Sequence, residues 1–136
     1  MKNILFAGIL VFSFSLFGQN NKDVSYLKIK QNSCIKKKGD FLTFKEVLSD
    51  SRCPVGVNCV WAGEIKVVIT VYLDKKIIKE ETLTISETDS QKNIAWFSQY
   101  LRADNRNIQN IEVFPYPKEG VKIKSKNYYI RIAYVK

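Results

Sequence analysis

The stretch EIKVVITVYLD, residues 64–74, decides the fold class of this 136-residue chain. Its side chains alternate between two faces, and most of them are β-branched or aromatic, which is typical of a β-strand. Asp74-Lys75-Lys76 then predicts a hairpin turn into a second strand, KIIKEETLTIS, at residues 76–86. One face of the first strand carries Val67, Ile69, Val71 and Leu73, and the other carries Lys66, Val68, Thr70 and Tyr72.

Four further segments predict strands on the same grounds: residues 24–31, 40–48, 107–117 and 127–135. In the segment 40–48, we expect Leu42, Phe44 and Leu48 to share one face. Short strands separated by turn residues are typical of antiparallel folds. The pattern therefore predicts an all-β protein, either an antiparallel sandwich (Ig-like) or a partly open barrel of six to seven strands.

Residues 86–105 fit two structures. Ile94, Phe97 and Leu101 recur at helical spacing and Ser90 offers a cap, which together predict one short helix near residues 90–101. The alternative is a short strand flanked by loops.

The N-terminal sequence MKNILFAGILVFSFSLFGQNN has the layout of a secretory signal peptide. Its apolar run is shorter than the roughly 20 residues of a membrane span. We expect residues 1–18 to be removed near Gly18/Gln19, with cleavage after Ser15 as the alternative. Residues 19–136 then form a single β-rich domain, periplasmic or secreted, with no integral membrane span.

The chain carries a formal net charge of +9. In an exported protein, anionic polymers or envelope surfaces are nearer partners for such a surface than nucleic acid, and we expect no nucleic-acid partner. The alternative is an ordinary solvated surface. The candidate basic patch is Lys36, Lys37, Lys38, Lys118, Lys122 and Lys124.

The second informative stretch is DSRCPVGVNCVWAGE, residues 50–64. Export makes a disulfide between Cys53 and Cys59 the first hypothesis, and Pro54 and Gly56 favour the turn that it needs. Cys34 is then either a small buried apolar residue or an intermolecular thiol, or it replaces one cysteine of this pair. With no histidine and no C-x-x-C spacing, we expect neither a metal site nor a redox centre.

Residues around this stretch are candidates for binding. Trp61 either packs over the disulfide, which we favour, or is an exposed aromatic of a binding surface. Asp50 and Arg52 could form an ion pair that holds the loop, and an exposed pair would contribute less than about 1 kcal/mol. The candidate binding residues are Arg52, Val55, Val57, Asn58, Trp61 and Glu64.

The same stretch resembles the D-S-R-C-P-x4-C-x-W-A-G segment of small exported bacterial proteins of the Bacteroidetes type. The later sequence VFPYPKEG…KNYYIRIAYV resembles their closing pattern, a proline-tyrosine-proline turn followed by a tyrosine-bearing last strand. The resemblance implies a β-rich exported domain with Cys53 and Cys59 joined. It implies no catalytic residues.

No catalytic constellation emerges from the residues. Without histidine, a Ser-His-Asp or Cys-His arrangement is impossible. No spacing among Asp50, Glu64, Asp89 and Asp104 singles out a carboxylate pair for glycoside hydrolysis. We therefore expect no enzyme and no cofactor.

The leading hypothesis is a non-catalytic binding or structural module of the cell envelope that presents a disulfide-pinned loop. Its partner would be an envelope protein. The alternatives are a basic-surface binder of an anionic envelope polymer and a secreted hydrolase inhibitor.

Overall fold

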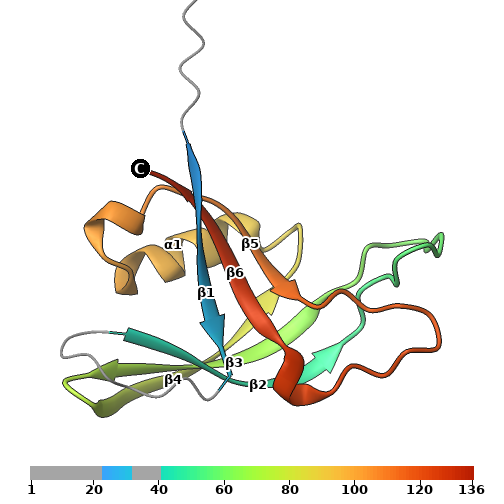
Figure 1. Ribbon diagram of the computed structural model, residues 1–136, viewed down its shortest axis with the longest axis horizontal. Coiled ribbons are helices and arrows are strands. Elements are labelled where there is room, and N and C mark those ends of the chain that lie inside the picture. The colour runs from blue at the N-terminus through green and yellow to red at the C-terminus, as the bar shows by residue number, and fades with distance from the viewer. Residues whose placement is uncertain (1–22, 32–40) are drawn as a thin grey trace, which may run out of the picture.

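The computed structural model describes residues 23–31 and 41–136. Within them, two three-stranded antiparallel sheets have the strand orders β1-β6-β5 and β2-β3-β4 (Figure 1). This confirms the all-β prediction. The predicted signal peptide, Cys34 and the lysines Lys36, Lys37 and Lys38 lie outside the described residues. The strands are β1 (Val24–Lys30), β2 (Phe41–Asp50), β3 (Ile65–Leu73), β4 (Lys76–Ile85), β5 (Ile108–Phe114) and β6 (Tyr129–Val135).

The core lies between the inner faces of the two sheets. Phe44, Ile65 and Ile69 of one sheet meet Ile130 and Ile132 of the other in one buried cluster. Each buried side chain of this size contributes about 1.5–3 kcal/mol of hydrophobic free energy. This cluster therefore fixes the relative position of the two sheets and of the loops that leave them.

The predicted helix is present as α1 (Ser90–Tyr100), and it closes one side of the core. Phe97 is fully buried, and Leu101 and Ile94 pack on the same cluster, as the helical spacing predicts. The expected cap was wrong by one position. Asp89 is the N-cap residue and Ser90 is the first residue of the helix.

Two apolar side chains that were expected to share a face with buried neighbours are exposed. Leu48 is exposed because β2 contains register shifts between Phe44 and Glu46 and between Val47 and Ser49. A bulge of this kind adds a residue to one strand and moves the following side chains to the opposite face. Leu73 is exposed because it ends β3 at the hairpin turn, which occupies residues 74–75 as predicted.

Two long connections leave the same end of the domain (Figure 1). The first, residues 51–64, joins β2 to β3 and is called the disulfide loop. The second, residues 115–128, joins β5 to β6 and is called the β5–β6 loop. We call the two loops together the tip.

Candidate functional site

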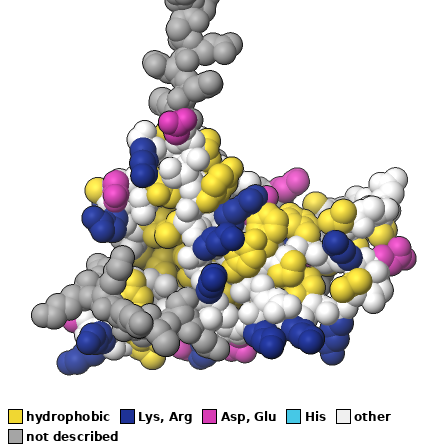
Figure 2. Space-filling model, in the orientation of Figure 1, with side chains coloured by type: hydrophobic (Ala, Val, Ile, Leu, Met, Phe, Trp, Pro, Cys, Tyr) yellow, Lys and Arg dark blue, Asp and Glu magenta, His cyan; other side chains and the backbone are white. Residues whose placement is uncertain are grey.

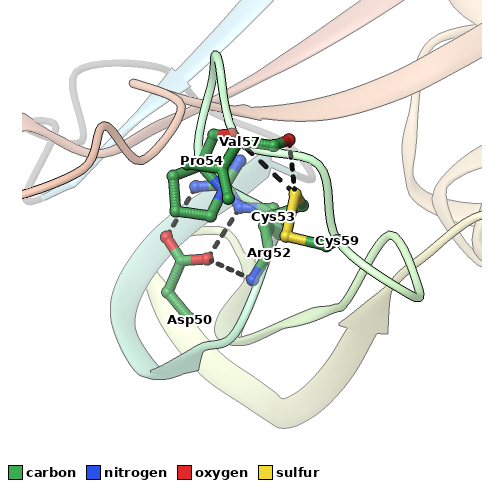
Figure 3. Close-up of a disulfide and its surroundings, with 6 residues drawn as sticks. All are labelled: Asp50, Arg52, Cys53, Pro54, Val57 and Cys59. Atoms are coloured by element: carbon green, nitrogen blue, oxygen red, sulfur yellow. Dashed lines mark hydrogen bonds and ion pairs between the residues drawn. A yellow bond between two sulfur atoms is a disulfide. The ribbon is translucent and has the colours of Figure 1, made fainter.

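The disulfide loop is closed by the predicted bond between Cys53 and Cys59, whose Cα atoms are 6.0 Å apart (Figure 3). Inside this ring, the amide of Val57 donates to the carbonyl of Pro54 at 3.1 Å, and Gly56 takes a positive φ of 87°. Proline and glycine are the residues that such a turn favours. The disulfide hypothesis is confirmed, and its local reason is this turn.

The base of the disulfide loop is held by its own backbone. The amide of Ser51 donates to the carbonyl of Glu64 at 2.9 Å, and the amide of Cys53 donates to that of Ala62 at 2.8 Å. Gly63 makes this close approach possible. It has a φ of 76°, and a Cβ there would lie 2.0 Å from the Ser51 carbonyl oxygen. Only glycine fits this position without a shift of the backbone.

The two loops of the tip are hydrogen-bonded to each other. The amide of Val55 donates to the carbonyl of Pro117 at 2.9 Å, and Val55 and Lys118 form a parallel bridge. Within the β5–β6 loop, the amide of Val121 donates to the carbonyl of Lys118 at 3.1 Å. Residues that are about 60 positions apart in sequence therefore form one surface.

Arg52 anchors the tip to the domain. Its Nε and Nη2 atoms donate to the two carboxylate oxygens of Asp50 at 2.8 and 2.7 Å (Figure 3). Its guanidinium also donates to the carbonyl of Val113 and, at 3.0 Å, to that of Pro115. The guanidinium carbon lies 4.6 Å from the centre of the Tyr116 ring, within cation–π range. One side chain thus ties the start of the disulfide loop to the start of the β5–β6 loop.

The expected ion pair is present, but it is not exposed. The side chains of Arg52 and Asp50 are only 6% and 10% accessible. The Arg52 guanidinium donates its hydrogen bonds to Asp50, Val113 and Pro115 inside the protein. This candidate binding residue therefore supports the loop. The carbonyls that Arg52 contacts belong to β5 and to the proline after it. No local pattern in the sequence predicts those contacts.

Two titrating groups beside Arg52 have shifted pKa values, Tyr128 and Asp50. Burial raises the pKa of Tyr128 to about 12, and its hydroxyl adds to this by donating to Asp50 at 3.0 Å. For Asp50, burial acts to raise the pKa, but the hydrogen bonds and charge of Arg52 outweigh it and hold the pKa below its usual value. Both shifts favour one arrangement, a charged pair with a neutral tyrosine.

The tip carries a concentration of exposed apolar side chains. Of the twelve exposed large apolar or aromatic side chains among the described residues, six lie in these two loops. Figure 2 shows hydrophobic side chains reaching the end of the molecule where the loops lie. A concentration of exposed apolar groups marks an interaction surface more strongly than isolated ones do. The six are Val55, Val57, Val60, Trp61, Tyr116 and Val121.

Trp61 is one of these exposed residues, with a relative accessibility of 63%. Exposure of this extent fits the alternative interpretation, an exposed aromatic residue of a surface, better than a buried one. Residues 56–64 belong to no strand, so the alternation of side chains between two faces does not determine the direction of Trp61. Of the other candidates, Asn58 is exposed, and Glu64 is partly exposed and pairs with Lys66 at 3.3 Å.

Val60, Tyr116 and Val121 are exposed residues of the tip that the sequence patterns did not predict. Tyr116 stands between two prolines and Val121 stands between glycine and lysine, which are both loop contexts. That signal predicts exposure, but it does not predict contact with the disulfide loop.

The second half of the candidate basic patch lies in the β5–β6 loop. Lys118, Lys122 and Lys124 are exposed there, and so is Lys126. Figure 2 shows Lys and Arg side chains beside the hydrophobic ones at this end of the molecule. The structure thus brings Lys118 of the patch against the disulfide loop, and Lys122 and Lys124 follow it in the β5–β6 loop.

A cleft of about 410 Å³ lies behind the tip, where Arg52 and Gly63 meet Asn93 of α1 and Glu112 of β5. Two of its polar groups are already in use, because Asn93 donates to the Thr84 carbonyl at 2.8 Å and Glu112 pairs with Arg131 at 2.7 Å. Across the described ranges, no group of three or more cysteines and acids is placed to hold a metal ion. The same ranges contain no helix long and apolar enough to cross a membrane.

Neither the protein-family models nor the curated proteins or solved structures compared with this chain contain a match to it.

Proposed function

We propose that this protein is an exported, non-catalytic β-domain of the cell envelope that binds an envelope component through the tip. One observation carries the proposal. Half of the exposed large apolar side chains among the described residues lie on two loops that are hydrogen-bonded to each other at one end of the fold.

Rigidity makes the tip suitable for binding. The disulfide, the Val55–Pro117 hydrogen bond and the buried Arg52 hold the loops before any partner arrives. A surface that is already ordered loses less conformational entropy when it binds. The exposed apolar groups then supply roughly 25 cal/mol for each Å² removed from water.

Export and the lack of catalysis rest on the sequence. The signal-peptide layout and the disulfide both favour an oxidising compartment. The chain has no histidine. Its cysteine motif resembles that of small exported bacterial proteins, and this resemblance implies no catalytic residues. We include membership of that group in the proposal.

The experiment measures retention of the purified mature protein on envelope fragments of the producing bacterium, by co-sedimentation. The test variant is Val60→Ser with Trp61→Ser, which removes two exposed apolar groups from the tip. The matched control is Ile77→Ser with Ile78→Ser, two exposed apolar residues of β4. We expect the tip variant to lose retention and the control to keep it. Equal retention of both variants and the wild type would overturn the proposal.

A further inference from the structure

We propose that the partner of the tip is the surface of an anionic lipid bilayer, with the apolar side chains entering the interface and the lysines lying at the headgroups. The inference rests on the proposed function, because it names the component that the same tip binds. Three features of the tip support a bilayer over a protein partner.

The first feature is the shape of the apolar surface. Val60 is fully exposed, with a relative accessibility of 104%, and Val55 and Val121 are about 60% accessible on turns. These side chains are exposed on loops, and none of the three lines the cleft behind the tip. A protein partner would need a matching pocket for each of them, whereas the fluid boundary between headgroups and acyl chains needs none.

The second feature is the chemistry of the two aromatics. Trp61 and Tyr116 are the exposed aromatic residues of the tip, and each has an apolar ring with a polar atom. Tryptophan and tyrosine concentrate at the membrane–water interface for this reason. The Arg52 guanidinium lies over the Tyr116 ring, 4.6 Å from its centre, so the ring is oriented before the tip contacts a bilayer.

The third feature is charge. Residues 115–128 contain four lysines, Lys118, Lys122, Lys124 and Lys126, and one acid, Glu119. Each lysine near an anionic leaflet adds attraction that falls off within a Debye length. The other ionic groups of the tip nearly cancel, because Asp50 neutralises Arg52 and Lys66 pairs with Glu64.

The depth of contact follows from the backbone. Loops have polar backbone groups that cannot be left unpaired in hydrocarbon, so the tip itself cannot enter the bilayer core. Only the side chains of the valines and Trp61 reach the acyl boundary, and the lysines stay in water beside the headgroups. The result is reversible docking on the surface.

The test uses the mature protein and two kinds of vesicle. One is phosphatidylcholine alone, and the other is equal parts of phosphatidylcholine and phosphatidylglycerol. We expect binding to the second kind only, with a loss of affinity as salt rises. We also expect a blue shift of Trp61 emission. The variant Trp61→Phe, which keeps only the partly buried Trp96, should bind without that shift.

Three variants separate the contributions. Val60→Ser with Trp61→Ser should weaken binding about tenfold or more. Replacing Lys118, Lys122 and Lys124 by glutamine should weaken it about a hundredfold. The control pair Ile77→Ser with Ile78→Ser should bind like the wild type.

Two results would overturn the inference. The first is binding to anionic vesicles with no Trp61 shift and no effect of the valine–tryptophan variant, which would reduce the contact to charge alone. The second is no vesicle binding while retention on envelope fragments still depends on the tip and is destroyed by protease treatment of the fragments. That second result would identify a protein partner, and the proposed function would stand. If retention never depended on the tip, the proposed function itself would fail.

Discussion

The buried ion pair between Asp50 and Arg52 gives the sharpest test of what holds the tip in place. The substitution Asp50→Asn keeps the shape of the side chain and removes its charge. Arg52 then stays buried, with a side chain 6% accessible, and all of its partners are uncharged: the carbonyls of Val113 and Pro115 and the oxygen of the new amide. We expect this single change to be among the most destabilising polar substitutions in the domain.

The magnitude follows from burial and geometry. Asp50 accepts two hydrogen bonds from the Arg52 guanidinium, at 2.8 and 2.7 Å, one from the Arg52 amide at 3.3 Å and a fourth from the Tyr128 hydroxyl at 3.0 Å. Removal of one partner from a buried pair destabilises a protein by about 3–5 kcal/mol, because the other charge is left uncompensated. Domains of this size have a free energy of unfolding of about 5–15 kcal/mol. The variant should therefore lose a large part of its stability.

The assay is urea unfolding of wild type and variant at neutral pH, with Glu80→Gln as the control. Glu80 pairs with Lys45 at 2.9 Å, but both side chains are about half exposed. An exposed pair of this kind contributes less than about 1 kcal/mol. The reasoning is refuted if Asp50→Asn loses no more stability than the control. If Asp50→Asn does not fold, Tyr128→Phe removes only one hydrogen bond to the carboxylate and should lose about 1.5–3 kcal/mol.

The same comparison has a predicted pH dependence. The pKa of Asp50 is lower in the folded protein than in the unfolded chain. Its carboxylate therefore stabilises the fold above the unfolded pKa of about 4, and this contribution disappears as the pH falls through the folded pKa. The stability difference between wild type and Asp50→Asn should be constant near neutral pH and shrink below about pH 4.

Three further predictions concern the tip and its support. Gly63→Ala should destabilise by about 3 kcal/mol or more, since a Cβ meets backbone at 2.0 Å, whereas Gly56→Ala, with open space around it, should lose only about 1–2 kcal/mol in thermal or urea unfolding. Replacing Cys53 and Cys59 by serine should lower the free energy of unfolding by about 2 kcal/mol. A wild-type protein with the same urea midpoint under reducing and oxidising conditions would contradict this. Since the pKa of Tyr128 is raised from 10.0 to about 12, the stability advantage of wild type over Tyr128→Phe should hold below pH 10.0 and decline as pH rises toward about 12.

Local patterns in the sequence were sufficient for the secondary structure and for the disulfide. Alternation in residues 64–74 predicted β3, and the spacing of Ile94, Phe97 and Leu101 predicted α1. Both patterns depend on which side chains share a face within one element, and that is a property of a few neighbouring residues. The turn around Pro54 and Gly56 is equally local, so the pairing of Cys53 with Cys59 was predictable.

Three features that local patterns missed or left open depend on how the backbone pairs within and between elements. The exposure of Leu48 depends on bulges in the pairing of β2 with β3. The burial of Arg52 depends on carbonyls 61 and 63 residues away. The exposure of Trp61 depends on a loop whose course is set by hydrogen bonds to its own base.

The sequence by itself determined the elements, the disulfide and the presence of apolar and basic residues in loops. Only the tertiary structure joined the β5–β6 loop, which carries Tyr116, Val121 and the lysines, to the disulfide loop through the Val55–Lys118 bridge. The physical reason is that the core packs the two sheets so that β2 and β5 end at the same end of the domain. Side-chain periodicity within one strand has no information about the strand that will lie opposite it.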